Sequence, residues 1–371
     1  MGSQRPFPTR TPSGAVIASP FDEPRLGPED FRVLRDVVNA HCGLDLAPDQ
    51  RSSVERRLRE RLSIVGLDSF GEYVRVLRAD PAAKGELEEA IECLTTNETY
   101  FLREEYQLRA FKDEVIPLLA KQAQGRRRLA VWSAGCSTGE EVYSLATVLL
   151  DSQELTGWDL LVYGSDISKR CLAHARRAVY GASSFRATPP EFRKRWFIER
   201  PEGALVHDRV RQICHFGQLN LLEAERAPAV GRVDAIFCRN VLIYLDSRAR
   251  RRVIDLFHER LYPGGVLLLG HSESLLNVST AFELLHLRDD LAYRRPLVGA
   301  FGYPSPRAMR VASSPVPGPH ASSSESESGA FLAGSRVPTP IPGSAGSGSS
   351  DRRDSPLMPP ARPAIPKKGT P

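Results

Sequence analysis

The sequence predicts an α/β fold built on a doubly wound, mostly parallel sheet, with a small helical domain before it. Apolar strand candidates alternate with amphipathic helices over residues 100–296. This alternation is typical of a parallel sheet covered by helices on both faces. A glycine-containing loop follows the first strand candidate, within LAVWSAGCSTGEEVYSLATVLL at residues 129–150. Over residues 28–94 the apolar spacing is that of helices alone.

The composition is that of a folded protein with no strong preference for polyanions. The chain has 371 residues, 41% of them hydrophobic, and a formal net charge of +5. Its basic residues are interspersed with acids, so we expect no nucleic-acid partner. The six cysteines form no CxxC pair, which favours reduced thiols over a metal site. No apolar run is long enough to span a bilayer. We expect a cytoplasmic protein without membrane insertion or bound metal, acting as a monomer.

The two ends of the chain differ from its centre. Residues 1–26 are rich in Pro, Gly and Ser and predict a flexible arm, and residues 299–371 predict a disordered Pro/Ser/Gly-rich tail. Between them we expect a helical domain over 27–95 and a larger domain over 96–298.

The apolar periodicity places the elements of both domains. The helical domain begins with a helix that carries Phe31 and stops at Gly43. Three more helices are predicted from about 49, around 70–77 and around 87–94. In the larger domain, strands are predicted at Leu129–Trp132, Leu160–Gly164, Val233–Cys238 and Val266–Leu269, with a final antiparallel pair at 282–287 and 291–294. Its helices are predicted at about 104–121, 141–150, 168–179 and 247–261.

The loop after the first strand carries Gly135 and Gly139, followed by Glu140 and Glu141. Loops of this kind bring backbone amides close to a nucleotide-like ligand. The spacing is not GxGxxG, and no Lys-Ser/Thr pair follows the second glycine as in a P-loop. The two glutamates would repel a pyrophosphate but tolerate a cationic or neutral ligand. The alternative is a tight turn with a solvated helix start, where acids favour the helix dipole.

Polar residues also follow two other strand candidates. Asp166 ends the second strand, where an acid accepts hydrogen bonds from ribose hydroxyls in doubly wound folds or caps the next helix. Arg239 and Asn240 end the strand at 233–238, within an otherwise apolar run. Because ligands bind at the carboxyl ends of parallel strands, we expect these side chains at one site. Tyr244 lies near the same rim, either at the site or as a core aromatic.

A run of mixed polar and aromatic residues, TTNETYFLRE at 95–104, joins the two domains. A capping box would explain Thr99 and its downstream acids but not the whole run. With this run included, the sequence resembles the CheR-type protein-glutamate methyltransferases that act on chemoreceptors. The motifs that carry the resemblance are, in order, TNETYFLRE, WSAGCSTGEEVYS, SDIS, LNLL (219–222), FCRNVLIYL and GHSE (270–273). The resemblance covers about residues 28–296, and the helical zone resembles the family's N-terminal domain.

The resemblance implies a class I, Rossmann-like methyltransferase fold with a small β insert at about 185–218. It implies S-adenosyl-L-methionine as methyl donor and S-adenosyl-L-homocysteine as product. Residues at matching positions would bind the donor: Asn97, Thr99, Arg103, Glu141, Asp166, Asn220, Leu221, Arg239 and Asn240. Arg103 and Tyr244 would lie nearest the transferred methyl group and are the predicted catalytic residues. Glu141 matches the donor-binding acid, and we expect Glu140 to be a charge at the helix start.

The implied reaction forms methyl esters on glutamate side chains of chemoreceptors. A glutamate carboxylate is already ionised at neutral pH, so the reaction needs no general base. The resemblance also implies that the helical domain meets the receptor's cytoplasmic helices, and its basic second helix, with Arg51, Arg56 and Arg59, is the predicted docking surface. The alternative for this helix is a solvated charged face.

Other readings of the chain stay open. Family members that hold a receptor's C-terminal tether carry a glycine-bearing loop in the insert, whereas here Gly203 and Gly217 form no clear glycine pair. A related methyltransferase acting on another acidic protein or a small molecule is one alternative. A non-catalytic adaptor that binds the donor is another.

Overall fold

The computed structural model describes residues 23–79, 81–223 and 231–297, all of which belong to one compact unit. The predicted tail and all but the last residues of the predicted arm lie outside these described residues. Within them, no helix combines the length and the apolar character that a membrane crossing requires.

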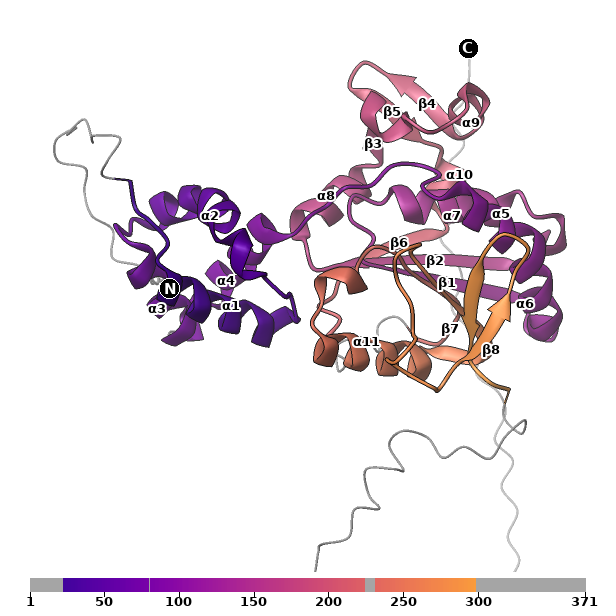
Figure 1. Ribbon diagram of the computed structural model, residues 1–371. Helices are drawn as coiled ribbons and strands as arrows, with labels where there is room; N and C mark the ends of the chain where they lie inside the picture. Colours follow the sequence, from indigo (N-terminus) through magenta and orange to yellow (C-terminus); the bar gives the residue numbers. More distant parts are fainter. Residues whose placement is uncertain (1–22, 80, 224–230, 298–371) are drawn as a thin grey trace, which may run out of the picture. The chain divides into compact units, whose positions relative to one another are not determined.

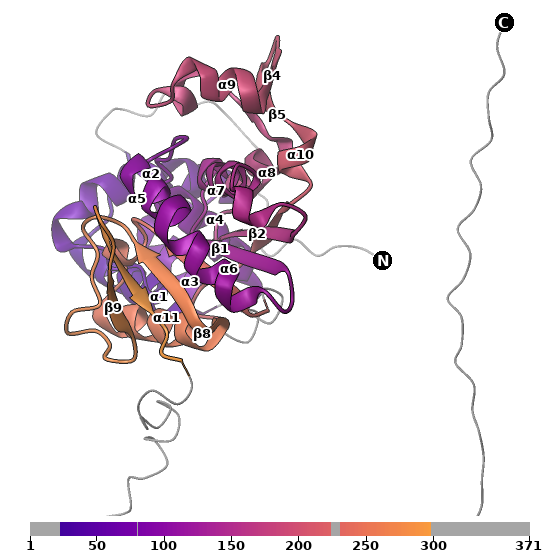
Figure 2. The same cartoon turned by 90° about the vertical axis from the view of Figure 1, so that its right-hand side faces the viewer.

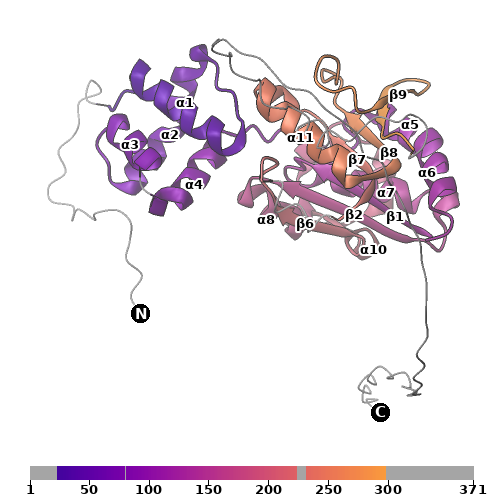
Figure 3. The ribbon, with the colours of Figure 1, turned by 90° about the horizontal axis from the view of Figure 1, so that it is seen from below.

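The N-terminal helices form a bundle, as predicted. They are α1 (Pro28–Cys42), α2 (Arg51–Val65), α3 (Phe70–Ala79) and α4 (Lys84–Leu94), with 3-10 turns at Pro48–Gln50 and Pro81–Ala83. α1 ends at Gly43, whose φ of +75° closes the helix in the left-handed conformation that glycine adopts without strain. Buried side chains from all four helices, among them Leu34, Leu58, Tyr73 and Ile91, share one core. Figure 3 shows this bundle.

The larger domain is built on a seven-stranded sheet of order β6-β2-β1-β7-β8-β10-β9. The strands are β1 (Arg128–Ala134), β2 (Asp159–Asp166), β6 (Cys214–Gln218), β7 (Val233–Cys238), β8 (Leu261–Leu269), β9 (Glu283–His286) and β10 (Leu291–Arg294). β6, β2, β1, β7 and β8 pair in parallel, and β10 pairs antiparallel with both β8 and β9. The predicted parallel sheet with a final antiparallel pair is confirmed.

Helices cover both faces of this sheet, because successive side chains of a strand point to opposite sides. Leu129 and Val131 of β1 pack with α6 (Ile116–Ala123) and α7 (Glu140–Leu150). Trp132 packs on the other face with α11 (Ser247–Arg260), its ring 5.3 Å from that of Phe257. Figure 1 shows α11 on one side of the sheet and α6 and α7 on the other. This domain also contains α5 (Glu105–Ala110), α8 (Lys169–Arg177) and 3-10 turns at Gln153–Leu155 and Leu242–Tyr244.

The structure corrects the extent of the predicted β insert. The insert is an antiparallel sheet of order β3-β5-β4, formed by Val179–Tyr180, Gly203–Val206 and Phe197–Arg200. It also contains a 3-10 turn at Ala182–Phe185 and the short helices α9 (Pro190–Trp196) and α10 (Asp208–Arg211). Figure 2 shows it standing away from the central sheet. Residues 214–218, predicted inside the insert, are instead β6, whose half-exposed sequence CHFGQ has no apolar run because it lies at a sheet edge.

The single helix predicted over 104–121 is interrupted. A turn of π-helix at Phe111–Val115 separates α5 from α6. Pro117 in the first turn of α6 supplies a physical reason, because proline has no backbone N–H and its ring clashes with the carbonyl group four residues earlier.

Candidate active site

The candidate site lies where the strand order reverses. β1 has β2 on one side and β7 on the other, and ligands of such sheets bind beyond the carboxyl ends of the strands at this point. A cavity of about 220 Å³ lies there. All ten predicted site residues line it: Asn97, Thr99, Arg103, Glu141, Asp166, Asn220, Leu221, Arg239, Asn240 and Tyr244. The structure therefore brings together residues from five separate stretches of the chain.

The glycine loop after β1 is packed closely against its neighbours. Gly135 has a φ of +82°, and a Cβ atom there would lie 2.4 Å from Cγ2 of Val241, in the loop after β7. Gly139 has a φ of +95°, and its Cβ would lie 2.7 Å from the Cβ of Ala175 in α8. Only glycine fits both the backbone conformation and the space at these positions. The glycines therefore let the first loop reach the cavity between two other segments.

Asp166 binds the glycine loop to the end of β2. One carboxylate oxygen accepts from the backbone N–H of Ser137 at 2.7 Å, and the other accepts from Ser168 at 2.9 Å. Burial raises the pKa of the Asp166 carboxyl, and these hydrogen bonds oppose that rise. The cap of α8 is Ser168, whose hydroxyl accepts from the backbone of Cys171. The cap that sequence analysis considered for Asp166 therefore belongs to the residue two positions later.

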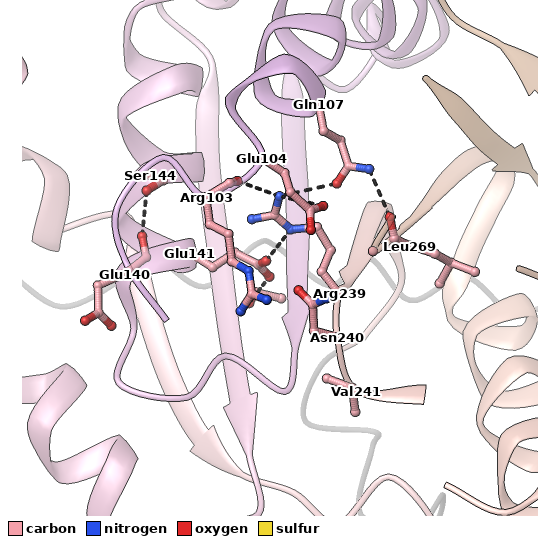
Figure 4. Close-up of polar contacts among 12 residues, drawn as sticks. Arg103, Glu104, Gln107, Glu140, Glu141, Ser144, Arg239, Asn240, Val241 and Leu269 are labelled. Atoms are coloured by element: carbon pink, nitrogen blue, oxygen red, sulfur yellow. Dashed lines mark hydrogen bonds and ion pairs between the residues drawn. The ribbon is translucent and has the colours of Figure 1, made fainter. Parts of the chain in front are cut away.

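Arg239 is the cation at the centre of the site, and its side chain is 2% exposed. Its Nε donates to Oε2 of Glu141 at 2.7 Å, and a terminal nitrogen donates to the backbone oxygen of Arg103 at 2.8 Å. The same nitrogen lies 3.7 Å from Oε2 of Glu104. The other oxygen of Glu141 accepts from the hydroxyl of Ser133 at 2.7 Å. Figure 4 shows the guanidinium of Arg239 between Glu141 and the backbone of Arg103, so that it joins two other predicted site residues.

The two predicted catalytic residues lie at the cavity with polar groups still available. The guanidinium of Arg103 donates to the backbone oxygen of Glu98 at 2.9 Å and makes no ion pair with any carboxylate in the described part of the chain. Tyr244 ends a 3-10 turn and its side chain is 37% exposed. The alternative of a core aromatic is therefore wrong for Tyr244.

Glu140 begins α7 as predicted, but it is not a solvated charge. Its side chain is 2% exposed and it does not line the cavity. Its carboxylate accepts from the hydroxyls of Thr138 at 2.6 Å and Ser184 at 2.9 Å. It thus ties the glycine loop to the first turn of the insert, a contact that no local pattern could reveal.

The helical domain supplies one wall of the cavity, which sequence analysis did not predict. Cys42, Leu44, Ile91 and Leu94 line the cavity from this domain. The amide of Asn220 donates to the backbone oxygen of His41 at 2.7 Å, and Leu44 forms an isolated antiparallel bridge with Leu245. Asn220 therefore contacts the helical domain and also lines the cavity.

Gln107 is another residue that sequence analysis missed. Its amide nitrogen donates to the backbone oxygen of Leu269 at 2.9 Å, and its amide oxygen lies 3.4 Å from a nitrogen of Arg239. It has helical spacing with the buried Phe111 and Val115. A polar residue at such a buried position is the signal that could have found it.

The residues present fit S-adenosylmethionine better than a phosphate-bearing ligand. That donor carries a sulfonium cation, an ammonium group and ribose hydroxyls, which call for acceptors and negative charge. The cavity offers carboxylates from Glu141 and Asp166. The side-chain oxygen of Asn240 is buried and has no hydrogen-bond partner within the described chain, so it is available to a donor group of a ligand.

Comparison with known proteins identifies similar sequences over the same residues. The chain matches the family models for the CheR methyltransferase all-alpha domain at residues 29–95 and the CheR methyltransferase SAM binding domain at residues 97–290. It is 35% identical to chemotaxis protein methyltransferase 2 of Vibrio cholerae, over 73% of this chain and 94% of the relative. It is 37% identical to a chemotaxis protein methyltransferase of Klebsiella aerogenes, over 73% and 92%. It is 36% identical to a probable biofilm formation methyltransferase of Pseudomonas putida, over 77% and 67%.

Proposed function

Because the chain belongs to the CheR methyltransferase family and is an S-adenosylmethionine-dependent methyltransferase, we propose that it methylates glutamate side chains of methyl-accepting chemotaxis receptors. The product would be the glutamate 5-O-methyl ester. The observation that supports this proposal best is the gathering of all ten matched residues around one cavity. Among them, the cation Arg103 lacks a carboxylate partner in the described chain.

In this proposal, hydrogen-bond acceptors and carboxylates of the chain hold the methyl donor, S-adenosylmethionine. When bound, S-adenosylmethionine supplies a methyl group on a sulfonium sulfur. The Asp166 carboxylate is held by two backbone N–H groups and keeps lone pairs for ribose hydroxyls. Glu141 is held by Arg239 and Ser133 and places its negative charge at the cavity. Asn240 offers its unpartnered oxygen to a donor group.

The glutamate side chain that receives the methyl group needs to be positioned more than it needs to be activated. A receptor glutamate is ionised at neutral pH, so one of its oxygens is already a nucleophile and no proton has to move. Holding two reacting groups in the right orientation can lower the activation free energy by on the order of 7–11 kcal/mol. Arg103 is the group that we assign to this task, since its guanidinium can pair with a carboxylate at the cavity. Tyr244, exposed at the same cavity, would shape the passage to the methyl group.

The helical domain is the proposed docking site for the receptor's cytoplasmic helices, with the enzyme acting in the cytoplasm as a monomer. Of the three basic residues predicted for this role, Arg56 is exposed and makes no ion pair within the described residues. Arg51 donates to the backbone oxygen of Leu26. Arg59 pairs with Glu55 at 2.9 Å, so its charge is already compensated. We therefore assign the larger share of docking to Arg56.

Incubation of the full chain with methyl-labelled donor and candidate receptors tests this function. The expected result is label on the receptor that mild base releases, since esters of carboxylates hydrolyse in base. A receptor with its candidate glutamates replaced by alanine is the matched control and should stay unlabelled. Base-labile label on a different acceptor would favour a related methyltransferase. Donor binding without transfer to any acceptor would favour the adaptor.

A further inference from the structure

Glu273, the last residue of the GHSE motif, has a carboxylate surrounded by backbone N–H groups. Its Oε2 accepts from Asn240 and from Gly270, each at 2.8 Å. Its Oε1 accepts from Val241 at 2.9 Å and from Ile243 at 3.3 Å. It makes no ion pair with any residue in the described ranges. One side chain after β8 thus accepts three backbone hydrogen bonds from the loop that follows β7.

The loop held in this way carries residues of the candidate site. Arg239, Asn240 and Val241 follow one another at the end of β7 (Figure 4). Asn240 has a φ of +58°, a left-handed conformation that few residues other than glycine adopt and that asparagine tolerates better than most. Its backbone N–H donates to Glu273, and its side chain lines the cavity. The carboxylate of Glu273 binds the backbone of this residue directly and so helps to hold the conformation.

Gly270 shows how close this contact is. A Cβ atom at Gly270 would lie 2.8 Å from Oε2 of Glu273 and 2.9 Å from the backbone nitrogen of Asn240. Any side chain at this position would therefore push the β8 end away from the loop. The glycine and the glutamate of GHSE thus act together, one by leaving space and the other by filling it with acceptors.

We propose that Glu273 is a positioning residue of the methyltransferase, which fixes Asn240 for donor binding and Tyr244 for methyl transfer. The assignment of Asn240 and Tyr244 rests on the proposed function. Glu273 itself does not line the cavity, so it acts through the loop. Hydrogen bonds to a charged acceptor are stronger than neutral ones, and four of them on one carboxylate make the loop conformation depend on it.

The test compares Glu273→Ala and Glu273→Gln with Glu283→Gln in the full chain. Glu283 pairs with Arg294 at 2.6 Å and lies away from the cavity, so it controls for loss of a carboxylate in the same domain. Amide hydrogen exchange is followed at residues 240–243 and 270. Calorimetry gives the Kd of the donor, and turnover on receptor gives kcat and KM. The glutamine variant keeps one acceptor oxygen and turns an NH2 group toward the other N–H groups, so it remains informative if the alanine variant does not fold.

We expect Glu273→Ala to lose protection at these amides, to raise the donor Kd by on the order of tenfold, and to lower kcat. The receptor KM should change less than kcat, because the docking helix lies elsewhere. The glutamine variant should show smaller changes of the same kind, and Glu283→Gln should show none. Retained amide protection in both Glu273 variants would overturn the proposal, as would lost protection with unchanged donor Kd and kcat. Exchange and donor Kd need no receptor, so a wild-type enzyme that fails to methylate receptors would refute the proposed function separately.

Discussion

The buried guanidinium of Arg239 donates to the carboxylate of Glu141 across 2.7 Å, joining the end of β7 to the first turn of α7. The same guanidinium donates to the backbone of Arg103. Breaking a buried ion pair by removing one partner leaves an uncompensated charge, which costs about 3–5 kcal/mol. Glu141 is therefore both a group at the cavity and the support of two other site residues.

This pair predicts that the two adjacent glutamates respond differently to the same substitution. Glu141→Gln should weaken binding of S-adenosylmethionine by on the order of tenfold, because the cavity loses a negative charge and Arg239 loses the closer of its two carboxylate partners. Glu140→Gln should leave donor affinity near that of the wild type, since Glu140 contacts Thr138 and Ser184 and does not line the cavity. Calorimetric titration with the donor measures both. Equal losses in the two variants would contradict the assignment.

The predicted catalytic pair is tested by turnover on receptor. Arg103→Ala should lower kcat/KM by about a hundredfold, since it removes the cation assigned to the acceptor carboxylate. Tyr244→Phe should have a smaller effect because the ring remains. Arg109→Ala is a suitable control, as Arg109 is an exposed residue of α5 outside the cavity. The assignment fails if both site variants turn over at nearly the wild-type rate.

Residues that follow buried strands could be predicted, whereas contacts between distant segments could not. Asp166 and Arg239 each end an apolar run, and the rule that ligands bind at the carboxyl ends of parallel strands places them together without a structure. The identity of the methyl donor came from the family resemblance that the ordered motifs carry. The hydrogen bonds that the loop after β7 donates to Glu273 and that Asn220 donates to His41 join segments far apart in the sequence. Helical and strand periodicities describe only neighbours along the chain, so they carry no signal for such contacts.

Two predictions were wrong for local physical reasons, one about the extent of the β insert and one about the exposure of a side chain. β6 lies at the sheet edge and is half exposed, so its sequence lacks the continuous apolar run of the inner strands. Glu140 stands in a first helical turn, where acids are usually solvated, and hydrogen bonds from the Thr138 and Ser184 hydroxyls help to offset the cost of its burial.

Close packing of the two cavity loops predicts a coupled pair of substitutions. Gly135→Ala should destabilise the protein and weaken donor binding, because the new methyl group would meet Val241 and the φ of +82° disfavours a side chain. Adding Val241→Ala should restore part of the loss by removing the atoms in contact. Thermal unfolding and donor titration of both single variants and the double variant measure this coupling. Additive effects would mean that the two loops do not press on each other.

Receptor docking should depend on Arg56 more cleanly than on Arg59. Arg56→Glu should raise the receptor KM by about fivefold, as expected for roughly 1 kcal/mol from an exposed charge, with donor affinity and thermal stability unchanged. Arg59→Glu should also lower stability, because it would place another carboxylate beside Glu55 and Glu23. Steady-state kinetics on receptor and thermal unfolding separate the two effects. A receptor KM that is unchanged in both charge-reversal variants would exclude this face as the docking surface.

Donor binding should weaken on acidification, beginning at a higher pH than an ordinary aspartate would cause. Burial raises the pKa of Asp166, hydrogen bonds from Ser168 and Ser137 oppose this, and the charge of Glu92 adds a smaller rise. Ribose hydroxyls are best accepted by the ionised carboxylate, so affinity present above this pKa is lost as the pH falls through it. Glu92→Gln removes the neighbouring charge while keeping an acceptor for the Ser168 hydroxyl. It should lower the pKa of Asp166 and move the loss of affinity to lower pH. Calorimetric donor Kd values for both proteins, taken from neutral pH downward, should give displaced curves, and coincident curves would show that Asp166 does not control binding.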